Sequence, residues 1–368
     1  MPDSPMKVGG FLAALAERFP LAWSESWDAV GLRVGDGDEP LGKVYVTLDA
    51  DARALEAAGA QGCSTLVTHH PPFLGQLGTL TTDSAAGAFA LAAARRGIAV
   101  ISMHTNLDRS PEGAEELPLR LGLPPGEPLE DSLSEVDVVT AFVPVGARDA
   151  VAAAMSVAGA GRIGRYEGCS FTATGAGRFT PRADARPTAG SQGSSVEPEE
   201  RLEMVTPVGG GPAAAAAARA VHPYEEPVIV VTRALLCRGA ARLGRVCAVE
   251  ETTLRVLAIH VGESLGVRSR VWGDPDRIVT RVAVASGSGG SLVGSVVASG
   301  AQAMIAGEVR YHDAMAAVAS GLALIEAGHD ATEWPLVDVL GRACRAIAGD
   351  EAVIQASPLM GWWTAERA

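Results

Sequence analysis

Several features that mark secreted or membrane-spanning proteins are missing from this chain of 368 residues. It has five cysteines, and none form a CxxC pair: Cys63, Cys169, Cys237, Cys247 and Cys344. An odd number of scattered cysteines fits reduced thiols better than a disulfide framework. No apolar run approaches the ~20 residues of a membrane span, and the opening stretch MPDSPMKVGGFLAAL lacks the long apolar segment of a secretory signal. We therefore expect a cytoplasmic protein without a membrane partner.

Basic and aromatic residues are also scarce. Lysine and arginine total 30 against 43 acidic residues, the net charge is −13, and aromatic residues make up 5% of the chain. Binding to a phosphate backbone needs clustered basic residues, and single-strand platforms need aromatic ones. No nucleic-acid partner is expected. Hydrophobic residues make up 48%, which is enough for a substantial core, and the length favours two domains.

What the chain does contain is an alternation of strand-like and helix-like stretches near its beginning. KVYVTLDA, STLVTHH and IAVISMHTNLD read as strands, with helices expected over residues 51–60 and 83–96. Strands that alternate with helices of this length indicate a parallel sheet.

The far end of the chain repeats this pattern. RVAVASGSG, QAMIAGEVRYHDA and LALIEAGHDATE read as strands, with helices expected over 291–299 and 313–320. The third strand of each half ends alike, because Asp108 follows His104 by four residues and Glu333 follows His329 by four. We interpret the two halves as an internal repeat.

The middle of the chain differs from both ends. It has its own strand-helix pattern, with VDVVTAFVPV, two alanine-rich helices and VHPYEEPVIVVTRAL, and contains the loop-like stretch RPTAGSQGSSVEPEE. We therefore expect residues 136–237 to form an inserted α+β domain. Residues 1–135 and 238–368 would then form one discontinuous α/β domain built from two halves.

Histidines and carboxylates gather where the expected strands end. LVTHHPPF places His69 and His70 side by side, and His104, Asp108, His329 and Glu333 fall at other strand ends. Ligands of parallel α/β sheets bind outside the carboxyl ends of the strands. Imidazoles and carboxylates suit Zn, Fe, Mn or Co. Four imidazoles and two carboxylates exceed the three protein ligands that one catalytic zinc usually takes. The set predicts two divalent metal ions about 3.5–4 Å apart.

The motifs DAVGL, THHPPF, HTNLD, GEVRYHDA and GHDATE resemble, in order, those of the dinuclear-metal-centre hexameric proteins. That family is related to NGG-interacting factor three and is commonly described as GTP cyclohydrolase 1 type 2 homologues. GRIGRYEGCSFTATGAGRF and VHPYEEP resemble the family's insert.

The resemblance implies metal ligands at His69, His70, Asp108, His329 and Glu333, with Glu333 as the bridge. It also implies an α/β domain with a PII-like or CutA-like insert, assembled as a toroidal homohexamer. The chain departs from the family pattern at Ala29, where an asparagine is usual, and in the PPFL that follows the histidines.

The sequence leaves the roles of other residues open between two alternatives. His104 is either a partner that orients ligands or moves protons, or a structural histidine, and His312 would line the same cleft without binding metal. For Asp28 the alternatives are a place in the same cleft and a structural role near the N-terminus. SGSGGS fits a tight strand-helix turn better than a phosphate loop, because the P-loop lysine is missing. VHPYEEP fits a turn better than a second metal site.

Two functions stay open at this point. The first is a metal-dependent hydrolase of the GTP cyclohydrolase 1 type 2 kind, in which the metals lower the pKa of a bound water to give hydroxide and His104 or His312 moves protons. The second is a non-enzymatic metal carrier, or a regulatory protein whose insert senses a small-molecule ligand. Fold alone does not decide between them.

Overall fold

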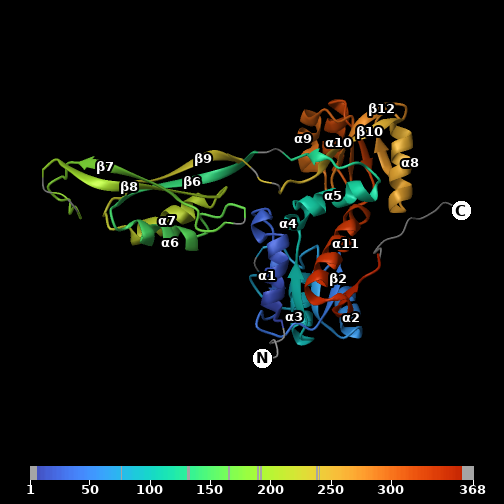
Figure 1. Cartoon of the computed structure of the whole chain (residues 1–368), viewed down its shortest axis with the longest axis horizontal. Helices are drawn as coiled ribbons and strands as arrows, with labels where there is room; N and C mark the ends of the chain where they lie inside the picture. The colour runs from blue at the N-terminus through green and yellow to red at the C-terminus, as the bar shows by residue number, and fades with distance from the viewer. Residues whose placement is uncertain are drawn as a thin grey trace. The chain divides into compact units, whose positions relative to one another are not determined.

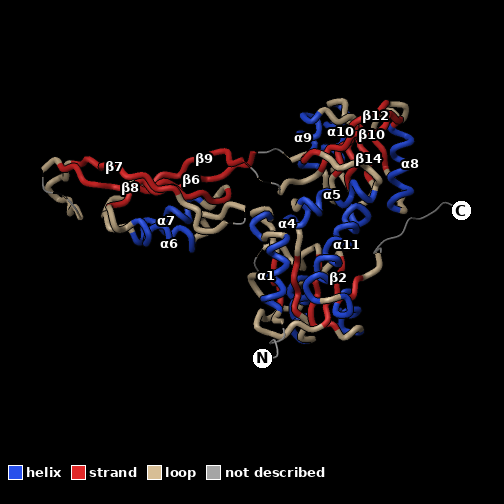
Figure 2. Tube along the Cα trace, viewed as in Figure 1, coloured by secondary structure: helices blue, strands red, loops and turns tan. Residues whose placement is uncertain are grey.

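The computed structural model describes residues 6–75, 77–130, 133–164, 166–188, 190, 193–237, 239 and 241–358. The chain divides into two compact units, one formed by Met1–Asp131 with Ala240–Ala368 and the other by Ser132–Gly239. Figure 1 and Figure 2 show a mixed α/β protein with several sheets, as expected from the sequence. No helix among the described residues is both long and apolar enough to cross a bilayer.

The first unit contains two sheets that share the arrangement of four of their strands. One has the order β1-β4-β3-β2-β15 and the other β11-β14-β13-β12-β10-β5. In each, three neighbouring strands are parallel, and a short strand pairs antiparallel beside the third of them. This shared order gives the sequence repeat a structural counterpart, with β2, β3 and β4 matching β12, β13 and β14.

The central parallel strands of the first unit are short and mostly buried, and the outer strands are more exposed. Their bounds are Gly31–Val34 (β1), Lys43–Thr47 (β2), Cys63–Thr68 (β3), Ala99–Ser102 (β4), Glu127–Pro128 (β5), Arg245–Thr253 (β10), Arg270–Trp272 (β11), Ile278–Val284 (β12), Ala303–Ala306 (β13), Ala323–Glu326 (β14) and Val353–Gln355 (β15). Every residue of β4, β13 and β14 is buried, as in parallel sheets that are covered on both faces.

Helices cover both faces of each sheet. Their bounds are Val8–Arg18 (α1), Ala52–Ala60 (α2), Ala85–Arg95 (α3), Thr105–Asp108 (α4), Pro111–Arg120 (α5), Leu254–Leu265 (α8), Val293–Ser299 (α9), Tyr311–Ala319 (α10) and His329–Ala348 (α11). Short 3-10 turns lie at Leu21–Trp23, Gly290–Leu292 and Asp350–Ala352. Side chains alternate along β2, so Val44 and Val46 pack against α1 and α11 while Tyr45 packs against α2 and α3.

The second unit is a four-stranded antiparallel sheet of order β7-β8-β6-β9. Its elements are Leu133–Pro144 (β6), Arg148–Val157 (α6), Phe171–Phe179 (β7), Ser195–Pro207 (β8), Gly211–Val221 (α7) and Ile229–Cys237 (β9). Helices α6 and α7 lie together on one face of the sheet and enclose an apolar core with Val139, Leu202 and Met204 (Figure 1). The first residue of β6 pairs with the last of β9, Leu133 with Cys237, so the chain enters and leaves this unit side by side.

The structure corrects the expected strand ends in one respect. The third strand of each half is shorter than expected, because β4 ends at Ser102 and β14 ends at Glu326. Asp108 is the last residue of α4, and His329 is the first of α11. In the second half the four-residue spacing is helical, and it places His329 and Glu333 on one face of α11 one turn apart, whereas His104 is the residue that precedes α4.

Candidate metal centre

His69 is fully buried immediately after β3, and the backbone fixes its ring orientation. Its Nδ1 lies 3.0 Å from the carbonyl oxygen of Met103, which can only accept, so Nδ1 donates. The other nitrogen, Nε2, is buried without a hydrogen-bond partner in the described part of the chain. It lies 3.7 Å from Asp108 Oδ2 and 3.8 Å from Glu333 Oε1. An imidazole held by its far nitrogen, with a free lone pair facing carboxylates, is the arrangement of a metal ligand.

His70 is oriented in the same way by a carboxylate. Its Nδ1 donates to Asp49 Oδ1 at 2.8 Å, and its Nε2 lies 2.8 Å from Glu333 Oε2. His329 approaches the same oxygen, with Nε2 at 3.1 Å, and its Nδ1 lies 3.3 Å from Glu308 Oε1. Despite these distances, Glu333 Oε2 makes no well-formed hydrogen bond within the described residues. Acceptor atoms that face each other this closely need protons or a cation between them.

The carboxylates of the cluster are themselves buried. Asp108 is 9% exposed and Glu333 is 5% exposed. Asp108 Oδ1 accepts a hydrogen bond from the hydroxyl of Ser286 at 3.1 Å. Burial raises the pKa of Asp108, whereas the contacts with His329, His69 and His70 outweigh burial and hold the pKa of Glu333 well below its usual range.

The carboxylates around the cluster raise the pKa values of the neighbouring histidines. Burial alone lowers the pKa of His70, but its hydrogen bonds with Asp49 and Glu333 raise that pKa to about 10. The contact with Glu333 raises the pKa of His329 to about 9. Such shifts, in a cluster of imidazoles and carboxylates, mark a functional site rather than an ordinary surface.

Gly287 closes one side of the cluster. Its backbone has a φ of +60°, and a Cβ atom placed there would lie 2.0 Å from Glu333 Oε1 and 3.3 Å from His329 Nε2. Only a glycine allows the chain to approach the carboxylate this closely. The SGSGGS stretch is thus a strand-helix turn, as expected, and it also supplies Ser286 and Gly287 to the centre.

His104 lies next to the cluster and is held by Asp28. Its Nδ1 donates to Asp28 Oδ1 at 2.8 Å, and its ring centroid lies 5.1 Å from that of His69. The second oxygen of Asp28 accepts from the backbone N–H of Thr105 at 3.0 Å and from its hydroxyl. Asp28 is therefore the residue that fixes His104 and the start of α4.

Three overlapping groups of side chains in the described structure could hold a metal ion. They are His69 with His70 and His104, His70 with His329 and Glu333, and His69 with Asp108 and Glu333. In each group the ligand atoms lie within 4.8 Å of one another. The five residues expected as ligands and His104 are thus brought together from both halves of the first unit.

His312 is not brought into these groups. It is exposed near the start of α10, and its ring packs against Tyr311 with centroids 5.6 Å apart. The repeat explains the difference, because the residue two positions after β13 is Glu308 and the residue two positions after β3 is His70. Glu308, which approaches His329, is the counterpart that the sequence reasoning missed. His222 also stays outside, since both of its ring nitrogens are engaged, with Phe142 O and Tyr224 N.

A cleft of about 780 Å³ in the first unit reaches the cluster. His70 and His329 line it together with Asp49 and Glu308, and Arg53 and Arg120 also line it. Both arginines are paired, Arg53 with Asp51 and Arg120 with Asp338. The volume is that of a site for a small molecule.

Fold and site together define an α/β protein that carries a histidine-carboxylate cluster at the carboxyl ends of its strands. The model of the family Duf34/NIF3 (NGG1p interacting factor 3) matches residues 6–356. The chain belongs to this family.

Two curated relatives illustrate the similarity. A Mycobacterium leprae protein named GTP cyclohydrolase 1 type 2 homolog is 33% identical over 338 residues, which cover 89% of this chain and 87% of the relative. A Bacillus subtilis protein of the same name is 32% identical over 327 residues, which cover 87% and 88%. Among solved structures, a Bacillus cereus protein related to NIF3 is 28% identical with a TM-score of 0.63, covering 97% of this chain and 98% of that one.

Proposed function

We propose that this chain holds two divalent metal ions in the first unit and is a metal-dependent hydrolase. The observation that carries the proposal is the position of Glu333. One of its oxygens faces His69, which lies by Asp108, and the other faces His70 and His329. A carboxylate whose two oxygens address two sets of ligands suits a bridge between two metals.

The residues present fit such metals. The buried Nε2 of His69 and Oε2 of Glu333 lack hydrogen-bond partners among the described residues, and buried polar atoms are rarely left unsatisfied. His69, Asp108 and Glu333 would hold one ion, and His70, His329 and Glu333 the other. The ion could be Zn, Fe, Mn or Co, because these suit mixed imidazole and carboxylate ligands. Bound ions would supply Lewis-acid activation of water and of the bond to be cleaved.

The remaining residues have supporting roles in this proposal. Asp49 and the Met103 carbonyl orient the ligand histidines. His104 receives its orientation from Asp28 and is the residue placed to accept or return a proton. His312, exposed on α10, has no such position. The cleft that reaches His70 and His329 would admit a small substrate, and the relatives' name suggests a nucleotide or similar heterocycle.

Metal analysis of protein purified without added metal tests the centre. The expected content is two ions per chain in the wild type, a loss at both sites in Glu333→Ala, and a loss in His329→Ala. His312→Ala is the matched control, because it removes an imidazole outside the cluster. Loss of a single metal in Glu333→Ala would contradict the bridge.

Turnover tests the reaction separately. Metal-loaded protein should hydrolyse a member of a nucleotide and heterocycle panel, and chelation should abolish this activity. Labile metal without turnover across the panel would instead support the metal-carrier interpretation.

The proposal extends to architecture and assembly. The second unit, with two helices on one face of an antiparallel sheet, suits a PII-like or CutA-like insert. The chain as a whole is proposed to form a toroidal homohexamer, a closed symmetric assembly. Light scattering coupled to gel filtration should give six times the chain mass of 37.7 kDa. A stable monomer at micromolar concentration would refute the assembly without affecting the metal centre.

A further inference from the structure

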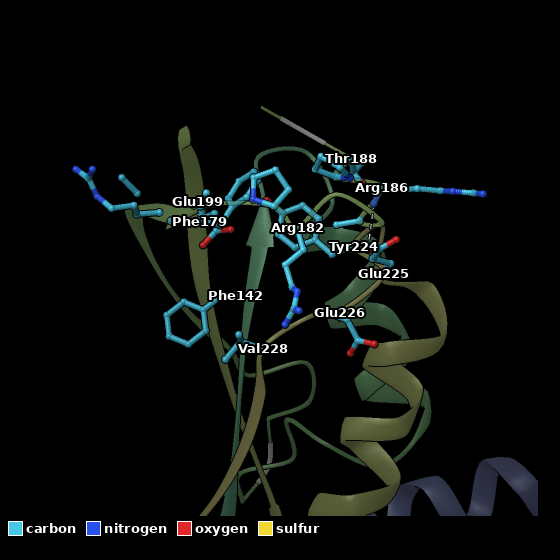
Figure 3. A pocket seen from close by; sticks show the side chains of 17 residues that line it. Phe142, Phe179, Arg182, Arg186, Thr188, Glu199, Tyr224, Glu225, Glu226 and Val228 are labelled. Carbon is cyan, nitrogen blue, oxygen red and sulfur yellow. Dashed lines mark hydrogen bonds between the residues drawn. The ribbon is translucent and has the colours of Figure 1, made fainter. Parts of the chain in front are cut away.

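The second unit contains a pocket of its own, within residues 142–228 and independent of the metal centre. Its volume is about 610 Å³, and it is formed by strands β6, β7 and β8 with the segments 180–188 and 224–228 (Figure 3). This is within the range of roughly 300–1,000 Å³ that small-molecule sites occupy. The segment after α7, which includes VHPYEEP, therefore does more than turn the chain.

The walls of this pocket are largely apolar and aromatic. Phe142, Phe179, Tyr224 and Val228 line it, together with Pro181 and Pro187. Val228 is 58% exposed, although it follows two prolines and a turn that hold it in place. A flat apolar body would be desolvated against these rings.

Three arginines line the pocket, Arg178, Arg182 and Arg186, and the side chain of Arg182 enters it. In Figure 3 the side chain of Arg182 extends into the space between Phe142 and Glu226. The side chain of Arg182 makes no ion pair or hydrogen bond with any described residue, although its backbone carbonyl accepts from the N–H of Ala185 at 3.1 Å. Arg186, from the same segment, also lines the pocket, but its side chain extends away from the pocket in Figure 3.

Two acidic residues around the pocket already have partners. Glu225 accepts a hydrogen bond from the backbone N–H of Arg186 at 3.2 Å. Glu226 lies 3.5 Å from the guanidinium of Arg219. The guanidinium of Arg182 is thus left as an uncommitted donor for an anion.

The hydroxyl of Tyr224 is a buried polar atom of the pocket wall, and it makes no well-formed hydrogen bond to any described residue. Burial, followed by the carboxylate of Glu199, raises the pKa of Tyr224 to about 12, so the hydroxyl keeps its proton. Glu199 is the acceptor near this hydroxyl, so the acidic group of a ligand is left to Arg182.

We propose that this pocket binds a small planar aromatic molecule that carries one acidic group. The aromatic body packs between Phe142, Tyr224 and Val228. The acidic group pairs with the guanidinium of Arg182, which offers a forked set of donors suited to carboxylate, sulfonate or phosphate. The second unit is then a ligand-binding domain whose specificity differs from that of the metal centre.

Two fluorescent dyes test the proposal on the full-length protein. 8-Anilinonaphthalene-1-sulfonate has a planar aromatic body with one acid, and N-phenyl-1-naphthylamine has the same body without it. We expect saturable binding of one sulfonate dye per chain. Arg182→Gln should weaken binding of the sulfonate dye by about tenfold, because a charge-assisted hydrogen bond is lost. Binding of the neutral dye should be unchanged.

Matched variants locate the site. Arg186→Gln removes the same charge from the same segment and should leave both dyes unaffected. Val228→Glu changes an exposed residue of the pocket wall and should weaken the binding of both dyes. His329→Ala, in the candidate metal centre, should leave the binding of both dyes unchanged. Each variant is checked by its thermal melt.

Several results would overturn the proposal. They are an absence of saturable sulfonate binding, equal effects of Arg182→Gln and Arg186→Gln, an equal effect of Arg182→Gln on both dyes, and a Val228→Glu protein that binds both dyes normally.

Discussion

At the scale of single residues, the candidate metal centre depends on groups that orient its histidine rings. Met103 and Asp49 determine which nitrogen of His69 and His70 faces inward. Asp28 does the same for His104. None of these three is itself placed to bind a metal in the described structure. The cluster is therefore oriented before any ion arrives, which lowers the cost of binding one.

Gly287 gives a sharp test at this scale. Gly287→Ala adds a Cβ where Glu333 Oε1 lies 2.0 Å away, and it does so at a φ of +60°. We expect a loss of about 1–3 kcal/mol in the free energy of unfolding from backbone strain alone, and reduced metal content because Glu333 must move. Chemical denaturation and metal analysis measure the two effects.

Gly294→Ala is the control for this substitution. Gly294 lies in α9 with open space around the position of a Cβ atom. Alanine there should raise stability by about 0.4–1 kcal/mol and leave the metal content unchanged. Equal behaviour of the two variants would contradict the role given to Gly287.

Metal binding should weaken as the pH falls from 9 to 7. Contacts with Asp49 and Glu333 raise the pKa of His70 to about 10, and the contact with Glu333 raises that of His329 to about 9, so both rings are largely protonated at pH 7 and His329 is about half protonated at pH 9. A ligand ring must lose its proton, and each displaced proton reduces the affinity by up to about tenfold per pH unit of acidification. Titration with Mn²⁺ at pH 7, 8 and 9 measures the slope, and a pH-independent affinity would refute it.

At the scale of elements, the two halves of the first unit place a histidine and an acid after a strand in similar ways. A buried parallel strand ends, the chain turns, and a histidine and an acid follow at the start of a helix. In the first half His104 precedes the short α4 and Asp108 is its last residue, and in the second both His329 and Glu333 lie in α11, one turn apart. The acid of each pair is buried, and Asp108 and Glu333 converge on His69.

The short helix α4 should depend on Asp28. This carboxylate has a fully buried side chain, accepts from the backbone N–H of Thr105 and pairs with His104. Asp28→Ala should cost about 3 kcal/mol, because it leaves a buried donor and a buried imidazole without their partner. Thermal or urea unfolding measures the loss. Asp38→Ala, which removes an exposed carboxylate paired with Lys7, should change the midpoint little.

The pH dependence of this contribution has a definite sign. Burial raises the pKa of Asp28, but the contacts with His104 and Thr105 outweigh it and lower that pKa from 3.8 to about 2. The contribution of Asp28 is present above pH 3.8 and is lost as the pH falls toward 2. The stability difference between wild type and Asp28→Ala should therefore shrink across that interval.

Much of this arrangement could be read from the sequence. The β3 strand is a run of buried residues that stops at His69, and residues 148–157 form the expected helix, α6. The strand-helix alternation predicted the mixed α/β fold, which the structure confirms. The acid four residues after a histidine was visible too, although its helical setting was not, because His329 and Glu333 follow so soon after a strand.

Other members of the site gave no such signal. Asp49, Ser286, Gly287 and Glu308 act through neighbours distant in the chain, so no local spacing reveals them. His312 misled for the opposite reason, since it stands in a promising motif but faces solvent on α10. Tertiary proximity decides these cases, and a single sequence does not contain it.

At the scale of the whole molecule, two compact units share one chain. The six clustered side chains all belong to the first unit, and the pocket of Figure 3 belongs to the second. The chain enters and leaves the second unit through the paired ends of β6 and β9. Insertions of this kind are tolerated where the two connections lie close together.

Removal of the second unit should therefore leave the cluster intact. We expect a variant in which a short Gly/Ser linker replaces residues 133–237 to fold cooperatively and to bind as much metal as the full chain. The linker can be short, because Leu133 and Cys237 are paired neighbours. Metal analysis of the purified variant, with its thermal melt, measures the result. A folded variant without metal would show that the second unit supplies an essential support.

The pairing of β15 with β2 has a consequence for how the protein is made. Val353 to Gln355 complete the sheet begun by Lys43 to Thr47, and α11 packs against the same sheet with α1. On the ribosome, β2 emerges long before its edge partner β15, while the second unit has all of its own strands and can fold in between. Glu333 also leaves the ribosome late, so the proposed metal sites cannot be complete before α11 has been synthesised. A nascent chain stalled before α11 should hold a folded second unit beside an open, protease-sensitive sheet.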